Sequence, residues 1–258
     1  MRKFNSGLLN LGFLFYRWIS PVVDPFKLFR SFSGYCRFFK DLIIYRRFKN
    51  REKIKFSDLY PCIHDRTETT PFDSHYFYQD IWAFEKILNS QVDSHVDIGS
   101  RIDYVGMLST ITKVKFVDIR PLSVKLNNFE CIKGSILSLP FEDNSIISIS
   151  CLHVAEHIGL GRYGDELDNE GTRKACKELS RVLAVGGSLY FSLPVGKPRL
   201  CFNAHRIHSP KQILDYFQDL KLIELSGIDD NVNFIRNIDI EILENSDYAC
   251  GLFHLIKV

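Results

Sequence analysis

The stretch H-V-D-I-G-S-R at residues 95–101 decides the fold of this chain. It reads as a short strand that holds an acidic residue and ends in a glycine, which lets the backbone turn tightly and approach a ligand closely. Further along, the apolar run Val114–Ile119 contains Asp118, 19 residues after Gly99. At about this spacing a carboxylate can accept hydrogen bonds from both hydroxyls of a ribose. The two runs therefore predict neighbouring strands with a nucleotide-type site at their ends.

Strand-like and helix-like patterns alternate from residue 73 to residue 258. A first helix is expected to be capped near Asp73 or Ser74, and later helices to cover Asp165–Leu183 and Pro210–Leu220. Such alternation implies a parallel sheet with helices on both faces. We therefore expect an α/β fold, doubly wound around a mostly parallel seven-stranded sheet of the Rossmann-like type. The expected strands are His95–Ile98, Val114–Ile119, Phe129–Ile132, Ile146–Cys151, Ser188–Leu193, Leu220–Leu225 and Gly251–Val258.

The expected domains are a basic, aromatic, helical arm at residues 1–55, a linker at residues 56–72 and a main domain at residues 73–258. The arm has 13 Lys and Arg against 3 Asp and Glu, a net charge of +10, so the rest of the chain carries −8 of the total of +2. It also has 13 aromatic residues. Pro21 and Pro25 are expected to break it into short helical pieces.

The composition of this arm is typical of an anchor on an anionic membrane surface, because aromatic rings settle among the headgroups while cations meet anionic lipid. The alternative is a helical cap packed on the main domain. Nucleic acid is not expected as a partner, because the arm has no recognisable recognition module.

The seven cysteines are scattered and form no C-x-x-C pair, which indicates neither a disulfide framework nor a zinc knuckle. No apolar run approaches the 18 or so residues that span a bilayer, and the best segment, Leu8–Ile19, contains Asn10 and Arg17. No small-residue cleavage site follows it, so secretion is not expected either. We expect a cytoplasmic protein that can lie peripherally on the inner face of a membrane.

Five motifs in order define a family resemblance. They are V-D-I-G at 96–99, V-D-I-R at 117–120, G-S-I-L-S-L-P-F at 134–141, E-H-I at 156–158 and R-V-L-A-V-G-G-S-L at 181–189. This order resembles class I S-adenosylmethionine-dependent methyltransferases from about residue 93 to residue 258. More narrowly, E-H-I-G-L-G-R-Y-G-D at 156–165 and F-N-A-H-R-I at 202–207 resemble domain-of-unknown-function family 268 (DUF268). The dehydrogenase fingerprint G-x-G-x-x-G is missing after the first strand, which argues against a nicotinamide cofactor.

The resemblance implies S-adenosylmethionine as cofactor and assigns residues to it. Asp97 and Gly99 match the first cofactor-binding loop, and Asp118 matches the ribose carboxylate. Ser135 and Ile136 match the residues at the edge of the adenine, and His153 matches the residue under the cofactor after the fourth strand. The pattern departs from the family at 100–102, where Ser, Arg and Ile stand in place of further glycines. Binding then requires that these side chains point away from the cofactor.

H-V-A-E-H at residues 153–157 also spells H-x-x-E-H, a zinc-protease pattern in which two histidines one helical turn apart bind the metal. The pattern needs a helix throughout. His153 directly follows an apolar strand, so it is expected in a turn, and no third ligand is apparent. We therefore expect no metal.

Loops after the fourth and fifth strands carry the residues expected to act on a substrate, because ligands enter at the carboxyl ends of parallel strands. We expect His157 and Glu156 to be catalytic, with His157 as a general base, although His157 equally suits a loop-stabilising role. The expected substrate-binding residues are Arg162, Asn203, His205 and Arg206, of which Asn203 and Arg206 could instead tie the loop to the domain. The expected substrate is a hydroxyl of a small molecule or glycan precursor. The alternative function is a catalytically inactive methyltransferase-like module that binds a partner or a membrane-associated assembly.

Overall fold

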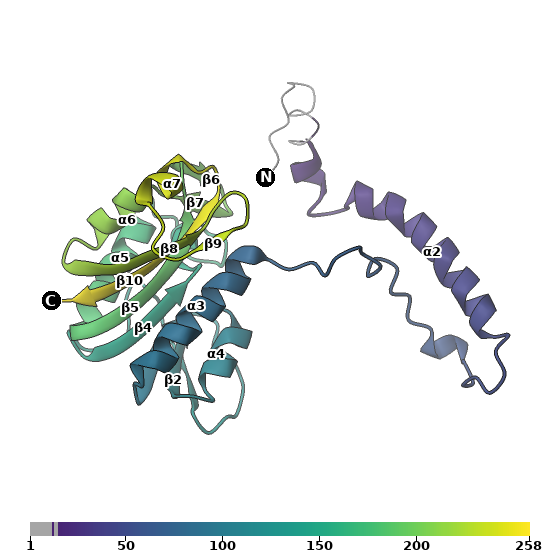
Figure 1. Ribbon diagram of the computed structural model, residues 1–258, viewed down its shortest axis with the longest axis horizontal. Helices are drawn as coiled ribbons and strands as arrows, with labels where there is room; N and C mark the ends of the chain where they lie inside the picture. The colour runs from purple at the N-terminus through teal and green to yellow at the C-terminus, as the bar shows by residue number, and fades with distance from the viewer. Residues whose placement is uncertain (1–11, 13–14) are drawn as a thin grey trace. The chain divides into compact units, whose positions relative to one another are not determined.

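The computed structural model of the protein describes residue 12 and residues 15–258 (Figure 1). The chain divides into two compact units, Met1–Phe72 and Asp73–Val258. The part of the predicted anchor segment before residue 15, residue 12 excepted, lies outside the described residues. Among the described residues, no helix is both long enough and apolar enough to cross a membrane.

In the first unit, the arm contains one long helix, α2 (Pro25–Tyr45), of 21 residues. The helical residues 15–19 end before Pro21 and the next helix begins at Pro25, so the predicted interruption at these prolines is present. The expectation of short pieces was wrong for α2, because Pro25 occupies its first turn, where its missing N–H and fixed φ are tolerated. Asp24 caps the helix by accepting hydrogen bonds from the backbone N–H groups of Phe26 and Lys27. A short 3-10 helix, η1 (Phe56–Asp58), follows in the segment predicted as a linker.

In the second unit, eight strands form one sheet in the order β3-β2-β1-β4-β5-β10-β8-β9. Strands β1 to β5 are mutually parallel, and β10 runs antiparallel to both β5 and β8. The seven predicted strands all lie in this sheet, so the predicted mostly parallel, Rossmann-like fold is confirmed, with the two-residue β9 added. The strands are β1 (Ser94–Ile98), β2 (Lys113–Asp118), β3 (Phe129–Lys133), β4 (Ile146–Leu152), β5 (Leu183–Val195), β8 (Leu220–Ile228), β9 (Phe234–Ile235) and β10 (Ala249–Lys257).

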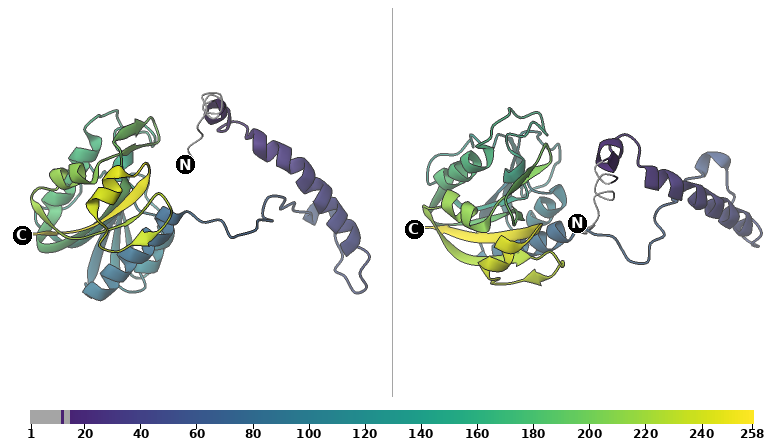
Figure 2. Two further views of the ribbon diagram at one scale, coloured as in Figure 1. Left: turned by 45° about the horizontal axis from the view of Figure 1, so that its top comes forward. Right: turned by 90° about the horizontal axis from the view of Figure 1, so that it is seen from above.

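Helices cover both faces of the sheet, as the turned views show (Figure 2). Helices α3 (Ser74–Ser90) and α4 (Ile102–Leu108) pack on one face, where Trp82 and Tyr104 are fully buried. Helices α5 (Gly171–Val182), α6 (Pro210–Tyr216) and α7 (Ile240–Asn245) contribute to the core on the other face. Because successive strand residues point to opposite faces, each central strand feeds both cores.

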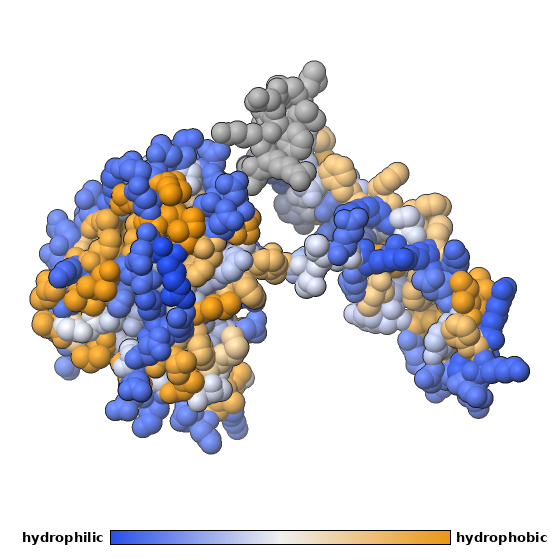
Figure 3. Space-filling model, viewed as in Figure 1, coloured by the Kyte–Doolittle hydropathy of each residue, from blue (hydrophilic) through white to orange (hydrophobic). Residues whose placement is uncertain are grey.

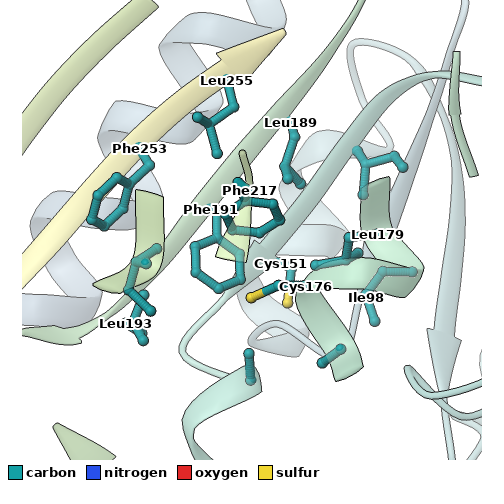
Figure 4. Close-up of a cluster of buried hydrophobic side chains, with 14 of the residues drawn as sticks. Ile98, Cys151, Cys176, Leu179, Leu189, Phe191, Leu193, Phe217, Phe253 and Leu255 are labelled. Carbon is teal, nitrogen blue, oxygen red and sulfur yellow. The ribbon is translucent and has the colours of Figure 1, made fainter. Parts of the chain in front are cut away.

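The larger core lies under α5 and α6 (Figure 4). The rings of Phe191 on β5 and Phe217 after α6 meet edge to face, with centroids 5.0 Å apart. Cys151 and Cys176 are fully buried in the same cluster and are free thiols. This core fixes β4 and β5, whose carboxyl ends lead into the loops of the candidate site.

Several predicted boundaries were wrong by a few residues. Helix α5 begins at Gly171, not Asp165, because Asp165 accepts hydrogen bonds from the backbone N–H groups of Gly159 and Tyr163 and holds residues 159–165 as a loop. Helix α6 ends at Tyr216 rather than Leu220. A hairpin of β6 (Arg199–Cys201) and β7 (His205–Ile207) was not predicted. Asp73 is the N-cap of α3, as expected.

Candidate functional site

A cavity lies at the carboxyl ends of β1, β2 and β4. Its empty space is about 700 Å³ when the open mouth is counted. Its walls contain five of the six residues predicted to bind a cofactor, and His157 as well. The lining residues are Ile98, Gly99, Val117, Asp118, Ile119, Arg120, Gly134, Ser135, Ile136, Leu137, His153, Val154, His157, Ile158, Tyr163 and Asp165.

Gly99 turns the chain out of β1 with a positive φ of 65°, a conformation that side-chain-bearing residues rarely adopt. A Cβ atom here would lie 3.3 Å from Val154 Cγ1 and 3.9 Å from Asp118 Oδ2. The Gly99 N–H donates to the carbonyl of Val117 at 2.9 Å, which ties the end of β1 to β2. The glycine therefore keeps the cavity open beside the Asp118 carboxylate.

Asp118 ends β2 at the cavity wall. Its Oδ1 accepts a hydrogen bond from the backbone N–H of Arg120 at 2.6 Å. This bond fixes the carboxylate, while Oδ2 is the oxygen that faces Gly99. Ser135 and the buried Ile136 follow β3 on the neighbouring wall, and the Ser135 hydroxyl accepts from the backbone N–H of Leu137. Asp118, Ser135, Ile136 and Leu137 together line this side of the cavity, with one carboxylate beside apolar side chains.

Asp97 does not line the cavity. Its fully buried carboxylate accepts a hydrogen bond from the Ser150 hydroxyl, and another from the backbone N–H of Ser100 at 3.0 Å. Burial raises the pKa of Asp97 to about 7, although these hydrogen bonds oppose the rise. The structure thus places Asp97 beneath the loop, where it organises residues 97–100 rather than facing a ligand.

The three residues that replace glycines also leave the cavity free. The Ser100 hydroxyl accepts a hydrogen bond from the backbone N–H of Leu152 on β4 at 3.1 Å. The guanidinium of Arg101 lies 5.2 Å from the Tyr76 ring and pairs with Asp103 at 3.1 Å. Ile102 is half-exposed at the start of α4. None of these three side chains lines the cavity, so none of them blocks a cofactor there.

His153 stands directly after β4 with a φ of 55°, an uncommon conformation for a residue with a side chain. Only Ala155–His157 form a helical turn, the 3-10 helix η2. The residues of H-x-x-E-H therefore do not share an α-helix, and His153 and His157 lack the one-turn spacing that the zinc-protease pattern requires.

Glu156 and His157 form a buried pair. His157 Nδ1 lies 2.6 Å from the carbonyl oxygen of Ala204, a distance that requires a proton on Nδ1, so Nε2 carries the lone pair. That Nε2 is 3.7 Å from Glu156 Oε1. Both oxygens of Glu156 are buried without a hydrogen-bond partner. Burial lowers the pKa of His157 to about 4 and raises the pKa of Glu156 to about 8.

The four predicted substrate-binding residues do not line the cavity. Arg206 donates to the carbonyls of Ile158 at 2.5 Å and Asp168 at 2.8 Å, and so ties two loops together. Arg162 donates to the Ala204 carbonyl and lies over the Tyr163 ring. The His205 ring lies 6.5 Å from the His157 ring, centroid to centroid. Asn203 is exposed in the turn of the β6–β7 hairpin.

Sequence reasoning missed four residues near His153, which are His75 and Tyr76 of α3, Tyr248, and Cys250 of β10. The His75 ring stacks on Tyr248 with centroids 5.1 Å apart and lies 5.6 Å from the His153 ring. The Tyr76 ring lies 5.0 Å from the His153 ring. One ring nitrogen of each histidine and Cys250 Sγ lie within 4.8 Å of one another. No spacing in the sequence joins these positions, because the fold alone brings them together.

Comparisons with known proteins agree with this architecture. Residues 142–233 match the family described as "Caenorhabditis protein of unknown function, DUF268". A comparison with curated proteins finds no match. A candidate sarcosine dimethylglycine methyltransferase from Galdieria sulphuraria is similar in structure, with a TM-score of 0.50 and 14% identity over 70% of this chain and 86% of its own.

Two further solved structures are similar at lower scores. The N-methyltransferase NodS from Bradyrhizobium japonicum, solved with S-adenosyl-L-homocysteine, has a TM-score of 0.48 and 14% identity over 85% of this chain and 98% of its own. The [4+2]-cyclase SpnF has a TM-score of 0.49 and 12% identity over 69% and 80%. At such identities the likeness shows the fold alone. This chain has a class I methyltransferase-like fold, and the family that it matches, over residues 142–233, is DUF268.

Proposed function

We propose that the protein is an S-adenosylmethionine-dependent methyltransferase whose cofactor binds in the cavity between β1, β2 and β4. The observation that carries the proposal is that Gly99, Asp118, Ser135, Ile136 and His153 line one cavity. A fold hosts many functions, so the site and not the fold has to support the activity.

The edge formed by Asp118 and Ile136 suits the nucleoside part of the cofactor. Asp118 Oδ2 can accept hydrogen bonds from ribose hydroxyls, since Oδ1 is held by the Arg120 N–H. Ile136 and Leu137 offer apolar contact for a flat base. Gly99 lets the backbone approach the sugar closely, and Arg101 is turned toward Tyr76. These contacts would also bind the product, S-adenosylhomocysteine.

The acceptor that we propose is a hydroxyl group of a small molecule or glycan precursor. When bound, S-adenosylmethionine supplies an electrophilic methyl group, and the acceptor oxygen must lie in line with it. His157 lines the cavity, and its Nε2 carries a lone pair beside Glu156 Oε1. The lowered pKa keeps the ring neutral at neutral pH. His157 could therefore take the proton of the acceptor hydroxyl, while the methyl group would pass from sulfur to oxygen and S-adenosylhomocysteine would leave. Glu156 borders the same nitrogen and would stabilise the resulting imidazolium once ionised.

Calorimetry with S-adenosylhomocysteine tests the cofactor site. We expect binding in the micromolar range for the wild type, and a loss of about tenfold to a hundredfold for Asp118→Ala, because a hydrogen bond to a charged group contributes about 1.5 to 3 kcal/mol. The matched control is Asp219→Ala, which removes an exposed carboxylate elsewhere. Equal binding by wild type and Asp118→Ala would remove Asp118 from the site. No binding by either protein would favour the inactive methyltransferase-like module.

We further propose that the arm holds the protein on an anionic membrane surface. Residues on one side of α2 are large, apolar and exposed, including Phe29 at 85% and Phe32 at 78%. Leu28, Phe29, Phe32, Tyr35, Phe39 and Ile43 recur at helical spacing and form this apolar face. Figure 3 shows hydrophobic and hydrophilic side chains interleaved along the arm.

The segment after α2 packs on a different side of the helix. A Cβ at the buried Gly34 would lie 2.8 Å from Ile63 Cβ, and Arg37 donates to the Ile63 carbonyl at 3.0 Å. At 100° per residue, Gly34 points about 160° away from Phe32. The described residues of this unit thus leave the apolar face uncovered, while Lys27, Arg30 and Lys40 provide charge that matches anionic lipid.

Sedimentation with anionic vesicles tests this placement. We expect wild type to bind and to be only partly released by high salt, because ring burial does not depend on ionic strength. Phe32→Asp should abolish binding, whereas Ser33→Asp adds the same charge on the adjacent side and should retain most of it. If the wild type ignores vesicles and removal of residues 1–55 unfolds the remaining domain, the arm is a structural cap instead.

A further inference from the structure

Three buried donor groups from distant parts of the chain meet beside the cavity. His75 lies in the first turn of α3, His153 follows β4, and Cys250 lies near the start of β10. Their donor atoms all lie within 4.8 Å of one another. The side chains are almost fully enclosed, with relative exposures of 8% for His75, 9% for His153 and 0% for Cys250.

One ring nitrogen of His153 contacts the neighbouring strand. Its Nδ1 lies 3.5 Å from Ser192 Oγ, and that hydroxyl donates to Gln79 Oε1 at 2.6 Å. Because the hydroxyl proton is engaged with Gln79, Ser192 can only accept from His153, so Nδ1 carries the proton and Nε2 carries the lone pair. Metal-binding histidines are commonly oriented by such a partner on the second nitrogen.

Ring packing alone does not account for this convergence. The His75 and Tyr248 rings stack, and the His153 ring lies near Tyr76, which would satisfy a purely structural role. Packing does not require two imidazole nitrogens and a thiol to point at one another in the same enclosed place.

A buried carboxyl group without a hydrogen-bond partner interacts with this cluster. Both oxygens of Glu156 are buried and accept no hydrogen bond, and the Glu156 carboxyl interacts electrostatically with Cys250 and Tyr248. Isolated buried carboxylates are costly unless a positive charge compensates them. A divalent cation at the cluster would supply that charge.

We propose that His75, His153 and Cys250 bind one zinc ion. Two imidazole nitrogens and a thiolate suit zinc, with bonds of about 2.0 to 2.1 Å to nitrogen and about 2.3 Å to sulfur. Donors on a tetrahedral ion then lie about 3.3 to 3.6 Å from one another. Side-chain shifts of about 1 Å would close the site from separations of up to 4.8 Å. On binding, the Cys250 thiol releases its proton to solvent and the sulfur bonds to the ion. Since His153 also lines the cavity, the fourth position of the ion can open toward it.

This proposal replaces the expectation of no metal. That expectation followed from pairing His153 with His157, which the structure separates into a turn and a 3-10 helix. The ligands that the fold brings to His153 are His75 and Cys250, 78 residues before it and 97 residues after it. The proposal is independent of cofactor binding, since it concerns the ion alone.

Zinc uptake by the full chain tests the site. The exposed thiols are first removed as Cys36→Ser and Cys62→Ser, so that they bind no stray metal. The protein is stripped with a chelator, loaded with zinc, desalted and measured by elemental analysis, and loaded separately with cobalt for its thiolate charge-transfer absorption. The test variants are Cys250→Ser and His75→Gln. The controls are Cys176→Ser, a buried thiol outside the cluster, and His157→Gln.

We expect one zinc per chain in the parent and both controls, and at least about a hundredfold weaker binding in each test variant. The cobalt thiolate band should disappear in Cys250→Ser. Should Cys250→Ser fail to fold, His75→Gln decides alone. The proposal is overturned if the parent takes up no zinc, or if the test variants bind as the parent does. It is also overturned if His157→Gln removes the ion while Cys250→Ser keeps it. S-adenosylhomocysteine binding is measured on the same samples, so failure here stays distinct from failure of the methyltransferase proposal.

Discussion

Replacing Glu156 by Gln should change how the stability of the main domain depends on pH. The carboxyl group is fully buried, both of its oxygens lack a partner, and burial raises its pKa from 4.5 to about 8. Because the folded-state pKa is the higher one, the folded chain keeps a proton that the unfolded chain has lost between these two values. Stability is therefore fully present below pH 4.5 and is lost as the pH rises to about 8.

The magnitude follows from the shift. One pKa unit corresponds to about 1.36 kcal/mol, so a shift from 4.5 to about 8 amounts to roughly 5 kcal/mol between the two limits. Relaxation or water entry reduces this, and we expect a difference of about 2 to 5 kcal/mol. Glu156→Gln keeps the shape of the side chain without the ionisation. The variant should match the metal-free wild type near pH 5 and exceed it in stability near pH 8.5.

Urea unfolding of metal-free protein at several pH values measures this difference. Trp82 is fully buried in the main domain and reports its unfolding in a Trp18→Phe background, where the tryptophan of the arm is removed. Glu142→Gln, at an exposed carboxyl group, is the control and should follow the wild type at every pH. If the curves for wild type and Glu156→Gln stay parallel from pH 5 to 8.5, Glu156 is not a buried, uncompensated acid. The lack of hydrogen-bond partners at its two oxygens would then not imply a raised pKa.

Three further substitutions separate residues that bind ligands from residues that hold loops. Arg206→Ala should lower unfolding stability by about 2 to 4 kcal/mol in a urea titration, because two donors to loop carbonyls are lost. Gly99→Ala places a side chain at positive φ beside Val154 and should weaken S-adenosylhomocysteine binding more than tenfold in calorimetry. His153→Asn should change stability by less than about 1 kcal/mol, since asparagine tolerates its backbone conformation, yet abolish zinc uptake. A large stability loss with unchanged uptake would identify His153 as a core residue only.

The sheet was predictable because burial on both faces leaves a direct trace in the sequence. In β4, the residues from Ser148 to Leu152 are all buried, and such a continuous run is typical of a central parallel strand. The turn at Gly99 and the carboxylate at Asp118 were predictable for a related reason, since both lie at strand ends. Strand ends mark the site in this class of sheet.

The remaining features depend on tertiary contacts that leave no local pattern. Asp97 belongs to the recognisable loop motif, yet its carboxylate turns inward to Ser150, which lies 53 residues further along the chain. Arg206 looked like a ligand for an anionic substrate, but its donors meet loop carbonyls. Cys250 stands in an apolar strand and resembles an ordinary core residue. The fold alone brings it to the two histidines, one on α3 and one directly after β4.

The backbone at His153 gives a physical reason to assign a role to its side chain. A residue other than glycine in the left-handed region costs about 1 to 2 kcal/mol, and glycine at the equivalent turn after β1 avoids this cost. Glycine at 153 would relieve the same strain, yet this chain has an imidazole there. The ring lines the cavity on one side and meets His75 and Cys250 on the other. Because strained residues cluster at functional sites, the strain is best explained by a ring that has to stand between these two places.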